Sequence, residues 1–277
     1  MKIIHTIIEL REFLAKQASI AFVPTMGNLH EGHLALMRQA RLHGACVVAS
    51  VFVNPLQFGP NEDFDRYPRT LITDCQLMQG LVDVVFAPSA SEMYPLPQAV
   101  FIEPPVIANE LCGASRPGHF RGMATVVLKL LNIVQPHVAL FGKKDYQQLH
   151  IIRQMVMQLN LAVQIVGGET VRAADGLALS SRNQYLDEAQ RRIAPQLRRV
   201  LLSLRDGLLQ GQQNFSQLSA HATQQLSAHG WQVEYVSLRK QEDLSVMNAL
   251  ANDGVIVAAA KLGGTRLLDN IEVCQAQ

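Results

Sequence analysis

In the first part of the chain, short runs of apolar, often β-branched residues alternate with longer segments whose apolar positions recur every three or four residues. The runs predict β-strands, and the longer segments predict amphipathic helices. Strands are predicted at residues 20–23, 46–53, 83–87, 100–102, 137–141 and 162–166, and helices at residues 31–43, 70–79, 122–134 and 146–159. This repeated β-α-β order predicts an α/β fold, a doubly wound parallel sheet with right-handed crossovers.

The pattern changes after Gly167 and Gly168. A long helix is predicted at residues 187–209, bent at Pro195 because the proline ring removes an internal hydrogen bond. A second helix at residues 216–229 is followed by candidate strands at 231–238, 255–260 and 265–273, the last two joined by a glycine turn. We therefore expect a larger domain over residues 1–173 and a smaller α+β domain over residues 174–277.

Composition and charge exclude several classes of protein. Of the 277 residues, 48% are hydrophobic and 17% are charged, which is too apolar for a disordered chain. The formal net charge of +1 provides no overall field to attract nucleic acid or an anionic membrane. No apolar stretch approaches the ~20 residues of a membrane span, and the N-terminus lacks a signal-peptide pattern. Since the four cysteines form no Cys-x-x-Cys pair, we expect a soluble protein of the reducing cytoplasm.

The sequence PTMGNLHEGH, residues 24–33, connects the first predicted buried strand to the first helix. His30 and His33 are three residues apart and share one face of that helix start. Gly32 lets a nucleotide approach the backbone, and unpaired N–H groups of the first turn attract phosphate, so the arrangement suits a triphosphate. The alternatives are a surface histidine pair or part of a metal site, but zinc requires further ligands that the neighbouring sequence does not supply.

Two further candidate sites follow the second predicted strand. In FVNPLQFG, residues 52–59, Asn54 and Gln57 offer neutral donors and acceptors suited to orienting a hydroxy acid. The alternative is that Asn54 and Pro55 simply begin a turn. The charged residues between 63 and 69 are interpreted as a solvated loop, whereas Asp74 is a candidate magnesium ligand.

Basic residues also lie in two later segments, one directly after the predicted strand at 137–141 and one near the expected domain boundary. In GKKDYQQ, residues 142–148, Lys144 follows a strand and can reach phosphates, while Asp145 can cap a helix or accept from a ribose hydroxyl. Gln148 lies one helical turn beyond. In LSSRN, residues 179–183, two hydroxyls and the guanidinium of Arg182 can bind a polyphosphate. The alternative is a turn that leads into the helix predicted from Asp187. Arg116 adds a cation on a Gly/Pro-rich loop, and for it and the lysine pair the alternative is a solvated surface position.

Taken together, a His-x-Gly-His element and a later serine-containing basic loop resemble the nucleotidyltransferase superfamily. The ordered set PTMGNLHEGH, FVNPLQFG, GKKDYQQ and LSSRN, which spans nearly the whole chain, resembles the pantothenate synthetase (pantoate–β-alanine ligase) family. The resemblance implies a homodimer with a Rossmann-like N-terminal domain. It also implies condensation of pantoate with β-alanine through a pantoyl adenylate, with ATP as substrate, magnesium accompanying ATP, and release of AMP and pyrophosphate.

The resemblance also implies roles for individual residues. His33 is the expected proton donor, and Gln57 and Gln148 are expected to hold pantoate, with Asn54 and Arg116 as further candidates for pantoate and β-alanine. The expected catalytic residues are His30, His33, Lys144 and Arg182. The expected ATP contacts are Met26, Gly27, Asn28, Leu29, His30, Glu31, Gly32, His33, Gly142, Lys143, Lys144, Asp145, Val171, Leu179, Ser180, Ser181 and Arg182.

Two other functions remain open at the level of sequence. One is a different nucleotidyltransferase, which adenylylates a phosphorylated substrate and stops there. The other is a non-catalytic nucleotide-sensing or RNA-binding module. The near-zero net charge and the lack of basic stretches interleaved with aromatic residues count against RNA.

Overall fold

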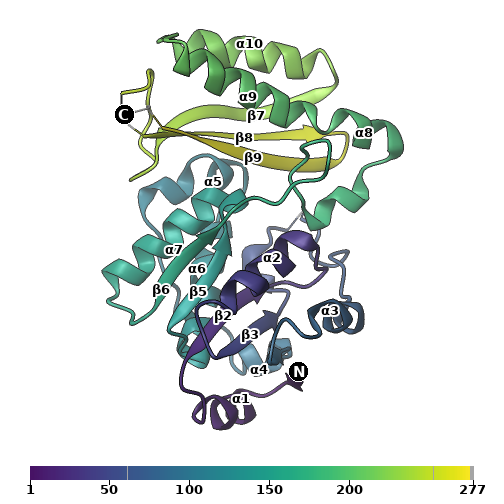
Figure 1. The fold of residues 1–277 in the computed structure, drawn as a ribbon, viewed down its shortest axis with the longest axis vertical. Helices are drawn as coiled ribbons and strands as arrows, with labels where there is room; N and C mark the ends of the chain where they lie inside the picture. Colours follow the sequence, from purple (N-terminus) through teal and green to yellow (C-terminus); the bar gives the residue numbers. More distant parts are fainter. Residues whose placement is uncertain (61, 252, 275–277) are drawn as a thin grey trace. The chain divides into compact units, whose positions relative to one another are not determined.

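The computed structural model describes residues 1–60, 62–251 and 253–274. The chain forms two compact units: Met1–Lys143 with Ile151–Glu169, and Lys144–His150 with the chain from Thr170 onward. Both units are composed of regular elements (Figure 1). Within the described residues, no helix is long and apolar enough to cross a membrane.

The first unit contains a six-stranded parallel sheet (Figure 1). Its strands are β1 Lys2–Ile4, β2 Ile20–Thr25, β3 Cys46–Val51, β4 Val84–Phe86, β5 Val138–Gly142 and β6 Gln164–Gly168, in the order β1-β4-β3-β2-β5-β6. Neighbouring strands of this sheet pair in parallel, as between Ile20 and Cys46 or Val138 and Gln164. This confirms the predicted doubly wound α/β fold.

Helices cover this sheet. The helices in this part of the chain are α1 Ile7–Leu14, α2 Glu31–Ala40, α3 Leu71–Met78, α4 Ala90–Met93, α5 Cys112–Ser115, α6 His119–Val134 and α7 Tyr146–Gln158, with short 3-10 helices η1 Pro55–Gln57, η2 Val106–Asn109 and η3 Lys143–Asp145. Residues 144–150, which include parts of η3 and α7, belong to the second unit. Met37 of α2 and Met78 of α3 pack against alternate residues of β2 and β3. Because Phe22 and Val48, on the opposite face, are also completely buried, the sheet is covered on both sides. The uninterrupted apolar run of β3 follows from that double burial.

One surface carboxylate joins several elements of the first unit. Asp83 Oδ2 accepts hydrogen bonds from Arg41 Nη1 and from Val47 N, both at 2.7 Å, and its carbonyl accepts from Lys2 N at 2.8 Å. Burial by itself raises the pKa of Asp83, but the bonds from Arg41 and Val47 outweigh it and lower the pKa below its usual value. The ionised form is therefore favoured by folding.

This contact predicts a pH-dependent contribution to stability. A carboxylate whose pKa is lowered by folding stabilises the fold above its unfolded pKa of about 4, and this stabilisation is lost as the pH falls. We expect Asp83→Ala to lower the free energy of unfolding by about 1 kcal/mol at pH 7 and by less at pH 3, in urea titrations. Asp206→Ala, which removes an exposed ion pair with Arg205, is the control and should change stability little. An Asp83 effect equal at both pH values would contradict this account.

The second unit contains an antiparallel sheet in the order β7-β8-β9 (Figure 1). Its elements are η4 Ser181–Tyr185, α8 Glu188–Ile193, α9 Gln196–Leu209, α10 Phe215–Ser227, β7 Trp231–Lys240, β8 Gly254–Leu262 and β9 Thr265–Val273. Leu201 of α9 and Leu226 of α10 pack with Ile256 and Ala258 of β8 in one core. Gly263 has a φ of +57°, which allows the tight turn between β8 and β9.

The structure corrects several predicted elements. Residues 100–102 do not form a strand, because Ile102 N donates to the side chain Thr125 Oγ1 of α6. The predicted bent helix is two helices, α8 and α9, separated at Ala194 and Pro195. The predicted strand at 162–166 begins two residues later, after Asn160 takes a left-handed conformation. The strand β1 and the helix α1 were not predicted.

Candidate active site

The carboxyl ends of three adjacent strands carry predicted motifs. β2 is hydrogen-bonded to β3 on one side and to β5 on the other, and chain order reverses at this point of the sheet. The segment 26–33 follows β2, the segment 52–59 follows β3, and Gly142 ends β5. Open parallel sheets bind ligands at such a switch point. The fold of the first unit therefore brings these sequence-predicted segments together.

The loop after β2 has an unusual backbone. Gly27 and Asn28 have φ values of +82° and +51°, in the left-handed region. A Cβ on Gly27 would lie 3.0 Å from Asp74 Oδ2 and 3.1 Å from Val51 Cγ1, so only glycine fits without displacement. Gly27 N donates to Thr25 Oγ1 at 3.2 Å, which anchors the start of the loop.

Asp74 of α3 binds the same loop through its carboxylate. Oδ2 accepts from Asn28 N at 3.0 Å and from Thr70 Oγ1 at 3.0 Å, and Oδ1 accepts from Leu29 N at 2.8 Å. Asp74 is 1% exposed. Among the residues that the structure describes, no group of three or more His, Cys, Asp and Glu side chains is arranged to hold a metal ion. The carboxylate predicted as a magnesium ligand thus holds the loop after β2 through hydrogen bonds to two of its backbone N–H groups.

The two histidines of the motif cap α2. His30 Nδ1 accepts from Gly32 N at 3.1 Å, and His33 Nδ1 accepts from His30 N at 3.3 Å. Their rings lie 4.1 Å apart between centroids. Because Nδ1 is an acceptor in both, the neutral rings carry their proton on Nε2. His33 N is also bonded, to His30 O at 2.8 Å, so the expectation of unpaired first-turn N–H groups is wrong for Gly32 and His33.

At the end of β3, Asn54 is enclosed by protein. It is 1% exposed. Its Nδ2 donates to Gln57 Oε1 at 3.1 Å and to Gly122 O at 3.2 Å, while its Oδ1 accepts from Tyr94 O–H at 2.7 Å and from Leu56 N at 3.3 Å. Both donors and both lone pairs of the amide therefore have protein partners. The geometry gives Asn54 the role of orienting Gln57.

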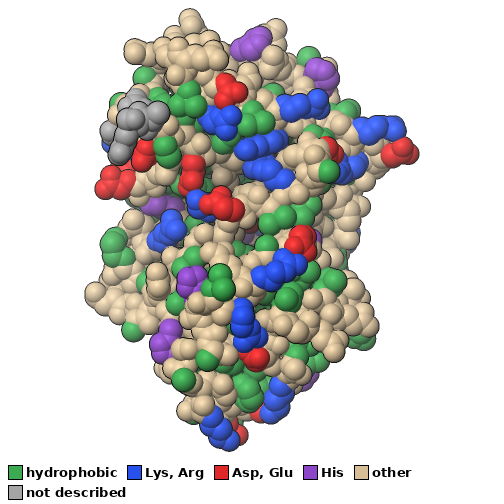
Figure 2. All heavy atoms as spheres, in the orientation of Figure 1, with side chains coloured by type: hydrophobic (Ala, Val, Ile, Leu, Met, Phe, Trp, Pro, Cys, Tyr) green, Lys and Arg blue, Asp and Glu red, His purple; other side chains and the backbone are tan. Residues whose placement is uncertain are grey.

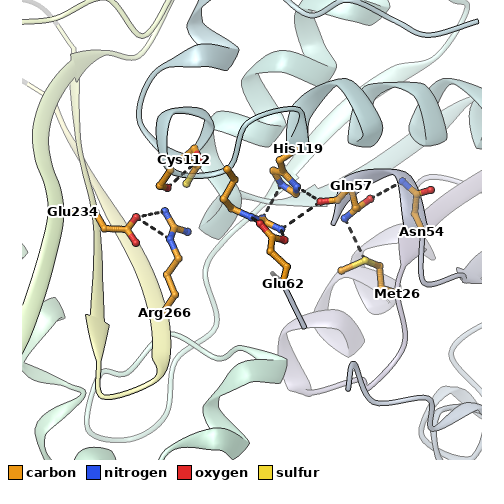
Figure 3. A network of polar contacts seen from close by, with 10 residues as sticks. Met26, Asn54, Gln57, Glu62, Cys112, His119, Glu234 and Arg266 are labelled. Carbon is orange, nitrogen blue, oxygen red and sulfur yellow. Dashed lines mark hydrogen bonds and ion pairs between the residues drawn. The ribbon is translucent and has the colours of Figure 1, made fainter. Parts of the chain in front are cut away.

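That orientation is visible in the polar network of Figure 3. Since Gln57 Oε1 faces Asn54, Gln57 Nε2 points the other way, where it donates to Met26 Sδ at 3.2 Å. Gly122 allows α6 to approach η1, because a Cβ there would lie 2.0 Å from Leu56 O. The side-chain amide of Gln57 is thus held by Asn54, which follows β3 and is itself bonded to α6, and by Met26, which follows β2.

The backbone of Gln57 is held as well. His119 Nδ1 lies 2.8 Å from Gln57 O (Figure 3). Its Nε2 lies 3.0 Å from Arg116 Nη1. Since Arg116 can only donate, the ring accepts at Nε2 and donates from Nδ1. Arg116 Nε donates to Glu62 Oε1 at 2.7 Å. Arg116 is a candidate substrate contact with a surface position as the alternative, and the structure places it half-buried in this network. The sequence pattern does not indicate its partners Glu62 and His119.

The remaining predicted residues of the first unit lie at its surface. Glu31 accepts from Arg38 Nη1 at 2.6 Å, and this hydrogen bond lowers the pKa of Glu31. Lys143 Nζ, beyond Gly142, lies 2.6 Å from Glu169 Oε1. In each pair at least one side chain is half exposed or more, so we expect each ion pair to contribute little to the free energy of folding.

In the second unit, two other predicted segments make local polar contacts. Lys144 Nζ lies 3.5 Å from Asp145 Oδ1, and Gln148 is half-buried on α7. Leu179 N donates to Val171 O at 3.0 Å, so these two predicted ATP contacts lie side by side. Ser180 Oγ then accepts from Arg182 N at 3.3 Å at the start of η4, next to Ser181. The serine–arginine segment therefore begins from a hydrogen-bonded turn.

The family of the chain follows from comparison with known proteins. Residues 2–272 match the model of the pantoate-beta-alanine ligase family. The chain belongs to this family. A pantothenate synthetase of Nitrosospira multiformis is 55% identical over 275 residues, 99% of this chain and 98% of the relative. The structure of pantothenate synthetase from Thermus thermophilus is 44% identical with a TM-score of 0.94, covering 99% of this chain and 100% of that one.

A second solved member of the pantoate-beta-alanine ligase family is described with ligands. The enzyme from Francisella tularensis, complexed with beta-gamma ATP and β-alanine, is 38% identical with a TM-score of 0.83. The match covers 98% of this chain and 97% of that one. The resemblance seen in the four sequence motifs is therefore confirmed at the level of family, and with it the assignment of the chain as a ligase.

Proposed function

We propose that this chain joins pantoate to β-alanine in two steps driven by ATP. In the first, a pantoate carboxylate oxygen attacks the α-phosphorus of ATP, and the bond to the bridging oxygen breaks so that pyrophosphate leaves. In the second, the β-alanine nitrogen attacks the carbonyl carbon of the pantoyl adenylate, AMP leaves, and the nitrogen loses a proton. The observation that carries this proposal is the family match over residues 2–272, with its motifs at the ends of β2, β3 and β5.

The first step needs alignment and charge stabilisation more than proton removal. A carboxylate is already ionised at neutral pH, so no general base is required. The Nε2–H groups of His30 and His33 are donors suited to phosphate oxygens, with His33 as the proposed proton donor. Lys144 and Arg182, with Ser180 and Ser181, are proposed to stabilise the charge that develops on the leaving pyrophosphate.

Pantoate is assigned to two glutamines. Gln57 is supported by the network that fixes its amide, and Gln148 by its place one helical turn beyond Lys144. Asn54 acts through Gln57, and Arg116 through its contact with Gln57 O at 3.5 Å. The proposed ATP contacts are residues 26–33 and 142–145, Val171, and residues 179–182. No covalent enzyme intermediate is required, because the adenylate itself is the activated species.

Magnesium is proposed to accompany the triphosphate of ATP. Phosphate oxygens and water are its usual ligands in such sites. No step is assigned to a cation held by Asp74, because its carboxylate already accepts hydrogen bonds from Asn28, Leu29 and Thr70.

Replacing Asp74 distinguishes a carboxylate that holds the loop after β2 from one that binds magnesium. We expect Asp74→Ala to lower the free energy of unfolding by about 2 kcal/mol, because charge-assisted hydrogen bonds to two backbone N–H groups are lost. Turnover should fall by about 10²-fold as the loop moves. Asp74→Asn keeps one acceptor oxygen, so its free energy of unfolding and its turnover should lie between those of the unaltered chain and of Asp74→Ala. Activity is measured across a magnesium titration, and recovery of Asp74→Ala at high magnesium would show that the carboxylate serves the metal.

Three broader assignments complete the proposal. The family resemblance supports a homodimer and a place in the cytoplasm, and the sequence pattern supports a domain boundary between residues 173 and 174. Sedimentation of the purified protein tests the first of these. The sequence pattern also favours small-molecule substrates over nucleic acid or membranes.

The reaction is tested by pyrophosphate release from ATP with each substrate omitted in turn. We expect release to require pantoate, and AMP to appear in quantity only when β-alanine is added. Release without pantoate would overturn the proposal. A nucleotidyltransferase that stops at the adenylate would give pyrophosphate with no β-alanine-dependent AMP, and a nucleotide sensor would bind ATP without turnover.

A further inference from the structure

A buried polar cluster in the second unit is formed by Arg172, Asp269 and Asn270, here called the Arg172 cluster. Arg172 donates from Nη1 to Asp269 Oδ2 at 2.7 Å and from Nη2 to Asp269 Oδ1 at 2.8 Å. The side chains of Arg172 and Asp269 are 19% and 3% exposed, and Asn270 is 7% exposed. A bidentate pair of this kind fixes the orientation of both side chains, so the Arg172 cluster has a defined geometry within the second unit.

The cluster holds the backbone of a predicted ATP-binding lysine. Asn270 Nδ2 donates to Lys144 O at 2.9 Å. Two residues further along each segment, Tyr146 O–H donates to Glu272 Oε1 at 2.9 Å. The carbonyl of Lys144 adjoins the Cα from which its ammonium group extends. Asn270 of β9 therefore fixes the backbone position from which the Lys144 side chain extends, although the two residues are 126 positions apart in sequence.

The same cluster holds the segment that leads to Ser180–Arg182. Arg172 Nη1 donates to Gly176 O at 3.1 Å, and the backbone of Arg172 forms an antiparallel bridge with Ala178. Ala178 O in turn accepts from Asn183 Nδ2 at 3.0 Å. The turn that precedes Ser180 is thus fixed on one side by the guanidinium and on the other by Asn183.

A second arginine reaches the cluster from α9. Arg198 Nη1 donates to Asn270 O at 3.4 Å, beside Arg172 Nη2 at 3.5 Å from the same oxygen. Burial, and then the neighbouring Arg172, lower the pKa of Arg198, while Asp269 opposes that effect. Figure 2 shows Lys and Arg side chains gathered over α9 and the adjacent strands. Asp269 therefore balances two guanidinium groups, and Asn270 N donates to its Oδ1 at 2.7 Å.

We propose that Asp269 and Asn270 are positioning residues that fix Lys144 and Ser180–Arg182 relative to each other for the phosphates of ATP. Their side chains bond to Arg172 and to the Lys144 backbone, so they act through the groups proposed to meet ATP. This inference rests on the proposed function. Its consequence is that two motifs separated by more than thirty residues in sequence act as one rigid cationic group.

The test is a double-mutant cycle between Asn270→Ala and Lys144→Ala, read by steady-state kinetics. We expect Asn270→Ala to raise the KM for ATP about tenfold, the usual cost of one hydrogen bond to a fixed group, with the KM values for pantoate and β-alanine nearly unchanged. In the Lys144→Ala background the same change should have an effect of less than about twofold, because the residues act as a unit. Asn270→Asp, which replaces the donor with an acceptor of the same size, should give the same separation of KM values.

Leu267→Ala is the matched control, because Leu267 lies on β9, is buried, and has an apolar side chain that packs in the core of the unit. It should lower thermal stability without changing the KM for ATP selectively. Additive effects of Asn270→Ala and Lys144→Ala, or an unchanged KM for ATP in whichever Asn270 variant folds, would overturn the inference. A wild-type chain that shows no pantoate-dependent pyrophosphate release would instead overturn the proposed function.

Discussion

We expect His33→Asn to reduce pantoate-dependent pyrophosphate release by about 10²–10³-fold while leaving the protein folded. Asparagine places an acceptor oxygen near the position of His33 Nδ1, so the hydrogen bond from His30 N that caps α2 can persist. What it removes is the Nε2–H donor. The measurement is single-turnover pyrophosphate release, with the melting temperature recorded for each variant.

His33→Gln provides the opposite substitution. Its longer side chain places an amide N–H near the position of Nε2 and loses the capping acceptor, so we expect lower stability with part of the activity retained. The stability difference should be near 1 kcal/mol, as for other lost helix caps. Equal activity in His33→Asn and in the unaltered chain would show that the imidazole serves only the helix.

The second large effect is expected for Lys144→Ala, with a fall in kcat/KM for ATP of about 10²–10³-fold. A single ammonium group on a phosphate oxygen is among the stronger charge-assisted contacts, and its loss leaves developing charge unpaired. Initial rates at varied ATP and saturating pantoate measure it. The fold should persist, since the backbone contact from Asn270 does not depend on the Lys144 side chain.

Lys143→Ala is the neighbouring control. Lys143 is bonded to Glu169, whose side chain is 81% exposed, so its loss should cost less than Lys144→Ala by at least about tenfold. Equal effects from the two lysines would mean that only the summed charge of the pair matters. The adjacent positions thus separate a specific contact from a general electrostatic one.

Much of the fold could be predicted from local pattern, and the exceptions have physical causes. The run from Cys46 to Val51 is apolar because both faces of β3 are covered, and this signal needs no knowledge of its neighbours. The three-residue strand β1 carries no such signal, since its pairing with β4 depends on residues 82 positions away. Residues 100–102 have strand-like composition, but the hydroxyl of Thr125 takes the N–H of Ile102.

For the candidate site, too, some features could be predicted from local sequence and others could not. Motifs that follow strands could be located because strand ends converge in a parallel sheet. The partners of these motifs could not, since Asp74 joins Asn28 across 46 residues and His119 joins Gln57 across 62. The sequence offers Asp74 only as a candidate magnesium ligand beyond the charged loop at residues 63–69. Only the folded chain shows the backbone N–H groups from which this carboxylate accepts.

The second unit is discontinuous in sequence, because residues 144–150 group with the chain from Thr170 onward. A recombinant fragment beginning at residue 170 would therefore lack a piece of its own structure, and would leave the amide of Asn270 and the carboxylate of Glu272 without Lys144 O and Tyr146 O–H. Cutting the chain near the boundary expected from the sequence is therefore expected to yield an incomplete second unit. A fragment that contains the complete second unit would need residues 144–150 joined by a designed loop to the chain from Thr170 onward.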